Sequence, residues 1–178
     1  MKDKYLGDSY DVVKRLWQQA LKDWAPLYAN PDFIPIVLRT QFTKMTLIEM
    51  QPDEPETPYS IFNDPDTGIR LPNGVSQTEG TGHIRLQTIV DQLRESAVRC
   101  VVTFDQSYYR SHKFGDAAKQ REIKMRHLAA KKCQAFYYES HAPFLFAFRD
   151  EKTKQDLRRR LISFGLPNIR IRDIPDSF

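Results

Sequence analysis

Cysteine, glycine and long apolar runs are scarce in this sequence. Its two cysteines, Cys100 and Cys133, belong to no CxxC pair, so neither a disulfide scaffold nor a zinc ribbon is expected. Gly7 is the only glycine before Gly68, so no glycine-rich loop can follow an early strand. No apolar run approaches the roughly 20 residues of a membrane-spanning helix, and the first ten residues lack the apolar segment of a signal peptide. We therefore expect a cytoplasmic protein that does not enter a membrane.

The composition that is present fits one globular domain. A chain of 178 residues can bury a single hydrophobic core, which predicts one domain over residues 1–178. Hydrophobic residues make up 40% and charged residues 28% of the chain, proportions that argue against disorder. The net charge of +4 is modestly basic and suits a polyanionic partner such as nucleic acid.

The spacing of apolar residues divides the chain into helices and strands. The periodicity of residues 8–24 predicts an amphipathic helix that Asp8 or Ser9 caps and that ends before Pro26. Asp116 is a possible cap for a later, basic helix. The further helices are predicted over residues 83–96, 116–132 and 150–165. Strands are predicted over residues 33–39 (doubtful, or at an edge, because of Pro35), 45–50, 59–63, 99–104, 134–138, 144–148 and 168–174.

This alternation of strands and helices predicts an α/β sandwich. Its sheet should be mostly parallel, with an antiparallel element near the C-terminal end. We expect residues 59–64, 99–105 and 134–139 to form adjacent strands. Ligands bind at the carboxyl ends of the strands in such sheets, which directs attention to the residues that follow each strand.

Three carboxylates occupy such positions. Asp64 and Asp66 follow the strand at 59–63 in "NDPDTG", and Asp105 follows the strand at 99–104. Like charges that lie close together repel, so a cluster of the three would require a cation, and Mg²⁺ or Mn²⁺ prefers oxygen ligands. We therefore predict that Asp64, Asp66 and Asp105 bind Mg²⁺ or Mn²⁺. The alternative is that "DPDTG" is an ordinary turn, because Asp, Pro, Thr and Gly all favour turns.

His141, in "YYESHAPFLF", lies between two apolar strands and is a candidate general acid, general base or metal ligand, with Glu139 and Asp105 as its expected partners. The alternative is a hydrogen-bonded histidine in the core or in a turn. No G-x-S-x-G elbow surrounds Ser107 or Ser140, which disfavours a serine hydrolase.

Candidate phosphate-binding residues are Arg110 and Lys113, which follow Asp105, and Lys14 on the first helix. Tyr108 and Tyr109 precede Arg110 and could stack on bases. Further basic residues lie on the predicted helix at 116–132 and at its end, namely Lys119, Arg121, Lys124, Arg126, Lys131 and Lys132. A solvated helix face would explain these charges without a ligand.

Two segments resemble a known family. "YSIFNDPDTG" resembles the strand and acidic-proline motif of Rossmann-like methyltransferases that modify adenine in nucleic acid, with DPDTG in place of the D/N-P-P-Y/F loop. "YLGDSYDVVKRLW" is similar to the opening segment of some members, including three-Cys-motif partner proteins. The resemblance implies a Rossmann-like three-layer sandwich, S-adenosylmethionine as cofactor, and Asp64 and Pro65 at the target base.

The leading functional prediction is a metal-dependent phosphodiesterase or nuclease that acts on nucleic acid. In it, Asp64, Asp66 and Asp105 bind the metal, Asp105, His141 and Asp64 are catalytic, and Arg110, Lys113 and Lys14 hold phosphate. The alternatives are an S-adenosylmethionine-dependent methyltransferase, or a non-catalytic descendant that binds nucleic acid or protein.

Overall fold

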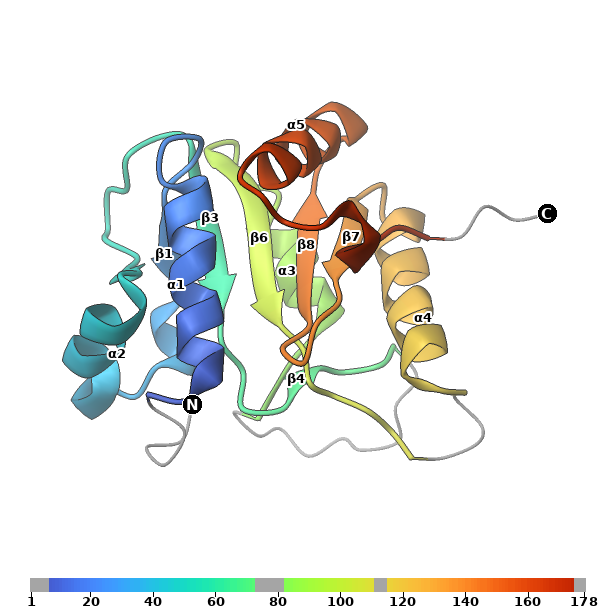
Figure 1. Ribbon diagram of the computed structural model, residues 1–178, viewed down its shortest axis with the longest axis horizontal. Coiled ribbons are helices and arrows are strands. Elements are labelled where there is room, and N and C mark those ends of the chain that lie inside the picture. The colour runs from blue at the N-terminus through green and yellow to red at the C-terminus, as the bar shows by residue number, and fades with distance from the viewer. Residues whose placement is uncertain (1–6, 73–81, 111–114, 175–178) are drawn as a thin grey trace.

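The computed structural model describes residues 7–72, 82–110 and 115–174, and its centre is a seven-stranded mixed sheet (Figure 1). The strands, in spatial order, are β2 (Glu49–Met50), β1 (Leu27–Ala29), β3 (Tyr59–Asn63), β6 (Val98–Phe104), β8 (Phe144–Phe148), β7 (Gln134–Tyr138) and β9 (Ile171–Arg172). Neighbours are parallel from β2 to β6 and antiparallel from β6 to β9. Within the described residues, no helix is both long enough and apolar enough to cross a lipid bilayer.

Helices pack on both faces of this sheet. They are α1 (Ser9–Leu21), α2 (Arg39–Thr46), α3 (Leu86–Gln92), α4 (Ala117–Ala130) and α5 (Glu151–Ser163). In Figure 1, α1 and α5 lie in front of the sheet and α3 lies behind it. Two short 3-10 helices, Pro31–Phe33 and Ile36–Leu38, connect β1 to α2. A separate parallel pair, β4 (Gly68–Ile69) and β5 (His83–Ile84), lies beyond the end of β3.

Alternation of side chains along the strands gives the sheet two cores. One, the α1-face core, contains Phe62, Val102 and Phe146 with Trp17 of α1 and Leu157 of α5. The other, the α4-face core, contains their sequence neighbours: the buried residues Ile61, Val101 and Leu145, together with Ile89 of α3 and Leu128 of α4. Successive residues of a strand point to opposite faces, so a strand buried on both faces is apolar throughout.

The predicted α/β class and the adjacency of residues 59–64 and 99–105 are confirmed. The prediction that residues 134–139 lie beside them is wrong, because β8 turns back after β7 and inserts between β6 and β7. The antiparallel part is therefore larger than predicted, with three parallel and three antiparallel pairings in the seven-stranded sheet.

The segment before β3 was also predicted incorrectly. Residues 33–39 contain no strand; Ile36 and Val37 are 78% and 87% exposed, so this apolar run is not buried. The short strand β1 was not predicted. The capping predictions hold, because Asp8 accepts a hydrogen bond from Tyr10 N at 2.8 Å at the start of α1, and Asp116 caps α4.

Candidate functional site

The carboxyl ends of β1, β3 and β6 meet at one edge of the sheet, at the bottom of Figure 1. From β1 the chain continues to β2 on one side, and from β3 it continues to β6 on the other. Loops that diverge in this way leave a crevice between them, which is where ligands bind in open α/β sheets. A pocket of about 390 Å³ lies there, and its lining comprises residues 31–36, Arg39 and Asp66. Asp66 is therefore the one predicted metal ligand that lines this pocket.

Asp64 and Asp105 share this edge but lie on opposite faces of the sheet. Asn63 of β3 pairs with Thr103 of β6, so the residue opposite Asp64 is Phe104. Asp105 is one residue further along its strand than Asp64 is. Because side chains alternate between faces, that offset turns Asp64 toward α1 and Asp105 toward α4. Each meets a lysine from its own helix, Lys14 or Lys124.

Asp64 belongs to a buried cluster of two carboxylates and one lysine. The Nζ of Lys14 lies 2.8 Å from Asp64 Oδ2 and 3.0 Å from Asp11 Oδ1, and Gly7 N donates to Asp11 Oδ2 at 2.6 Å. Burial alone would lower the pKa of Lys14, but the two carboxylates raise it above its ordinary value. Burial raises the pKa of Asp64, and Lys14 opposes this shift.

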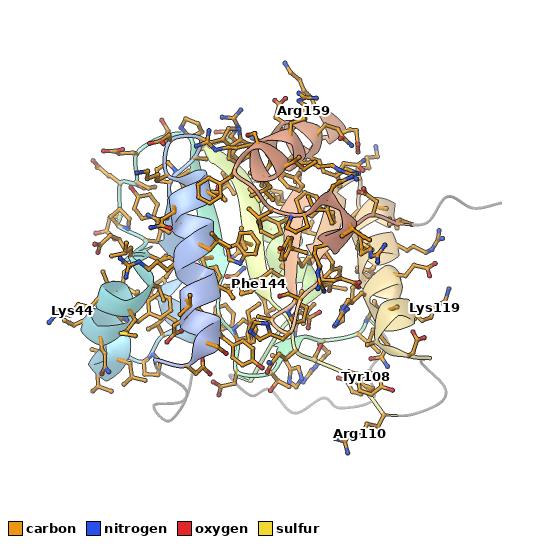
Figure 2. All side chains as sticks on the ribbon, viewed as in Figure 1. Lys44, Tyr108, Arg110, Lys119, Phe144 and Arg159 are labelled. Atoms are coloured by element: carbon orange, nitrogen blue, oxygen red, sulfur yellow. The ribbon has the colours of Figure 1, made fainter. Side chains whose placement is uncertain are left out.

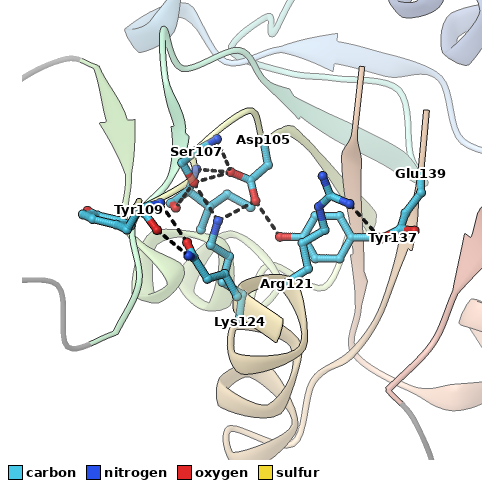
Figure 3. Close-up of polar contacts among 9 residues, drawn as sticks. Asp105, Ser107, Tyr109, Arg121, Lys124, Tyr137 and Glu139 are labelled. Carbon is cyan, nitrogen blue, oxygen red and sulfur yellow. Dashed lines mark hydrogen bonds and ion pairs between the residues drawn. The ribbon is translucent and has the colours of Figure 1, made fainter. Parts of the chain in front are cut away.

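Asp105 is the centre of a second buried network (Figure 3). Its Oδ1 accepts from Ile69 N at 2.8 Å and lies 2.6 Å from Ser107 Oγ. Its Oδ2 accepts from Lys124 Nζ and from Tyr137 Oη, both at 2.7 Å. A carboxylate has about four acceptor positions, so these partners occupy it. Asp105 thereby joins β4, the loop after β6, α4 and β7.

The geometry around Asp105 is tight. A Cβ atom on Gly68, where φ is +114°, would lie 2.4 Å from Asp105 Oδ1, so this position requires glycine. The Nζ of Lys124 also lies 2.6 Å from Ser107 Oγ, an arrangement of hydroxyl, amine and orienting carboxylate that resembles a nucleophile with its base. Burial lowers the pKa of Lys124, and Asp105 opposes this shift; burial raises the pKa of Tyr137, and Asp105 reinforces it.

A third polar group, which the sequence analysis did not identify, is formed by Asn63 at the end of β3, on the face of the sheet that α3 covers. The fully buried amide of Asn63 exchanges hydrogen bonds of 2.8 and 3.0 Å with Gln92 of α3. Its Oδ1 also accepts from Asn30 at 3.1 Å, and its Nδ2 donates to Thr103 at 3.3 Å. The signal for this network was an asparagine at the end of an otherwise apolar strand, where a polar side chain requires partners.

The structure does not bring Asp64, Asp66 and Asp105 together as one cluster. Two of them are separated by the sheet and neutralised by different lysines. In residues 7–72, 82–110 and 115–174, no group of three His, Cys, Asp or Glu residues could hold a metal ion. The use of Mg²⁺ or Mn²⁺ stays a prediction, and a shared three-carboxylate site is no longer its basis.

The predicted partners of His141 have other contacts. Glu139 pairs with Arg121 at 2.7 Å and with Arg172 at 3.4 Å, and Asp105 is occupied by its own network. The ring of His141, which is exposed, stacks on Tyr10 with 5.5 Å between the ring centroids. His141 therefore lies beside the first turn of α1.

The predicted phosphate-binding residues differ in their positions and contacts. Lys14 is buried and engaged with two carboxylates, Arg110 is exposed at the edge, and Lys113 lies outside the described residues. Much of the basic charge on α4 is paired: Lys119 and Arg126 both contact Glu122. The helix is therefore less basic as a surface than its sequence suggests.

Comparisons of this chain with protein-family models, with curated proteins and with solved structures give no match. The resemblance to adenine methyltransferases stays a prediction.

Proposed function

We propose that this protein is a divalent-cation-dependent phosphodiesterase or nuclease that acts on nucleic acid, with its active site at the crevice between β1 and β3. The observation that carries the proposal is the position of Asp66 in the lining of that pocket, two residues after the buried, lysine-bound Asp64. Perturbed, charged side chains beside a cleft at a sheet's carboxyl edge are typical of functional sites.

The fold supports this location. We infer a Rossmann-like three-layer sandwich, because helices pack on both faces and the parallel half of the sheet reverses its strand order between β1 and β3. In this arrangement the loops after β1 and β3 form the walls of the binding crevice.

Two carboxylates suffice for the proposed cation. Mg²⁺ is commonly bound by one or two protein carboxylates together with substrate phosphate and water, so Asp64 and Asp66 would hold it without Asp105. Carboxylate oxygens are the ligands that a hard cation such as Mg²⁺ prefers. When bound, the cation supplies a Lewis acid that polarises a phosphoryl oxygen.

The surrounding residues have distinct proposed roles. Lys14 fixes the orientation of the Asp64 carboxylate, and Asp11 in turn anchors Lys14. His141, which stacks on Tyr10 one turn before Lys14, is the group that moves a proton. Asp105 positions the loop after β6 and does not contact the substrate.

Asp66→Asn tests the proposal against a matched control in the same pocket. Wild-type protein should cleave labelled oligonucleotides with Mn²⁺ or Mg²⁺ and gain thermal stability from millimolar Mn²⁺ by mass action. Asp66→Asn should lose both effects, because one of two cation ligands loses its charge. Asp32→Asn, which changes an exposed acid in the same pocket lining, should keep both.

Two results would contradict the proposal. The first is wild-type protein that Mn²⁺ neither stabilises nor activates. The second is calorimetry in which S-adenosylmethionine binds and Mn²⁺ does not, which would support the methyltransferase alternative.

A further inference from the structure

The loop that follows β6 is held at several points. Ser107 Oγ lies 2.6 Å from Ile69 O and accepts from Lys124 at 2.6 Å. Two residues later, the backbone of Tyr109 is clamped by the buried side chain of Gln120, which accepts from Tyr109 N at 2.9 Å and donates to Tyr109 O at 2.7 Å. Gln120 also donates to Gly115 O at 3.0 Å. The backbone from Ser107 to Tyr109 is thus fixed to β4 and α4.

Tyr108 and Arg110 flank the clamped residue and project into solvent. Tyr108 is 50% exposed and Arg110 is also exposed. Figure 2 shows both at the lower rim of the molecule, the rim formed by the carboxyl ends of β3 and β6. Within the part of the chain that the structure describes, neither side chain has a hydrogen bond, ion pair or ring contact. The molecule therefore presents an exposed aromatic ring and an exposed guanidinium group on either side of the clamped Tyr109.

We infer that Tyr108 and Arg110 bind an unpaired nucleotide, so that the substrate is single-stranded nucleic acid. This inference depends on the proposed function for the reaction, and it adds the class of substrate. A base can stack on a tyrosine ring while an arginine binds the adjacent phosphate, and the fixed backbone reduces the entropy lost on binding. In a duplex the base faces are already stacked on each other, so this pair selects single strands.

The test is binding of a labelled oligothymidine of about 20 nucleotides, followed by fluorescence anisotropy in EDTA so that no cleavage occurs. Tyr108→Ala should weaken single-strand binding about tenfold, the size of one lost base stack, whereas Tyr108→Trp should retain it. Arg110→Ala should weaken binding and reduce the slope of log affinity against log salt by roughly one, because one phosphate contact is lost. A hairpin duplex of the same length should bind more weakly than the single strand.

Matched controls lie at the far end of the molecule. Phe164→Ala removes a ring that is 45% exposed after the end of α5, and Arg159→Ala removes an exposed guanidinium group at the upper rim in Figure 2. Neither should change binding. Equal losses in Tyr108→Ala and Phe164→Ala, equal affinity for duplex, or no binding at all would overturn the inference.

The outcomes separate the inference from the proposed function. Protein that binds single strands through Tyr108 but cleaves nothing with Mn²⁺ would refute the phosphodiesterase alone. Protein that cleaves with Mn²⁺ but binds equally well after Tyr108→Ala would refute the nucleotide contact alone.

Discussion

Asp64 and Asp105 are the same residue type at the same edge of one sheet, yet their partners give them different roles. Asp64 shares Lys14 with a second carboxylate, Asp11, whereas Asp105 is the only carboxylate in contact with Lys124 among the described residues. Replacing both members of a buried ion pair with apolar residues often changes the stability of a protein little. Removing only one member is costly, because the other charge is left buried without a partner. The two aspartates should therefore respond differently to the same substitution.

Asp105→Asn should reduce the free energy of unfolding by roughly 3–5 kcal/mol, because it leaves the fully buried ammonium group of Lys124 without a carboxylate. Asp64→Asn should cost less, about 1.5–3 kcal/mol for a hydrogen bond to a charged group, because Lys14 retains Asp11. Urea unfolding of both variants measures the difference. Asp105→Asn combined with Lys124→Met should recover part of the loss; equal losses in the two single variants would refute this assignment.

The sequence predicted these residues at one edge but could not predict their faces. The position of each aspartate after an apolar strand was visible in the sequence, and parallel neighbouring strands place both at one edge. Their faces depend on the register between β3 and β6, where Asn63 pairs with Thr103. This register joins residues that are 40 positions apart in the sequence, such as Asn63 and Thr103. A shift of one residue would move each side chain of the strand to the opposite face of the sheet.

At the scale of elements, the short pair β4 and β5 carries His83 to the Asp105 network. Burial lowers the pKa of His83, and the positive charges of Arg70 and Lys124 lower it further, while Asp105 opposes them. Because the pKa of His83 is lowered in the folded protein, the free energy of unfolding should depend on pH. The sign of this pH dependence is set by the difference between the number of protons bound by the folded and the unfolded protein.

The unfolding free energy should decrease as the pH falls below about 6.5, the ordinary pKa of histidine, because the unfolded chain then binds a proton that folded His83 does not. The decrease ends once the pH is below the lowered pKa of the folded state. His83→Gln should remove this contribution and flatten the pH dependence of the urea midpoint below about pH 7. If wild type and His83→Gln have parallel pH profiles, His83 does not titrate with a lowered pKa.

Prediction of elements succeeded where local chemistry determines them. The helices with an aspartate cap and an apolar stripe were found, including α1 with Asp8 and α4 with Asp116. It failed at residues 33–39, where the apolar side chains of Ile36 and Val37 point to solvent and composition alone suggested a strand. It also missed β1, which has three residues and no periodicity to detect.

At the scale of the whole molecule, the order of the strands in the sheet could not be predicted from the sequence. The hairpin of β7 and β8 was predicted as two strands, but the insertion of β8 beside β6 depends on pairing across some 40 residues, as between Val102 and Phe146. The order of the strands also affects how the protein unfolds. Strands β3, β6, β7 and β8 each contribute residues to both cores, so neither face can unfold while the other keeps an intact sheet.

This shared sheet predicts a single cooperative unfolding transition. Both tryptophans report on one face, because Trp17 lies in the α1-face core and Trp24 packs against it. Leu128→Ala, in the α4-face core, should create a cavity and lower the free energy of unfolding by roughly 2–5 kcal/mol. If the sheet couples the two faces, urea unfolding followed by tryptophan fluorescence should shift by the same amount as unfolding followed by far-ultraviolet circular dichroism. A fluorescence transition that stays in place while the dichroism signal becomes biphasic would show that the two cores unfold separately, although strands of both the parallel and the antiparallel half contribute to each of them.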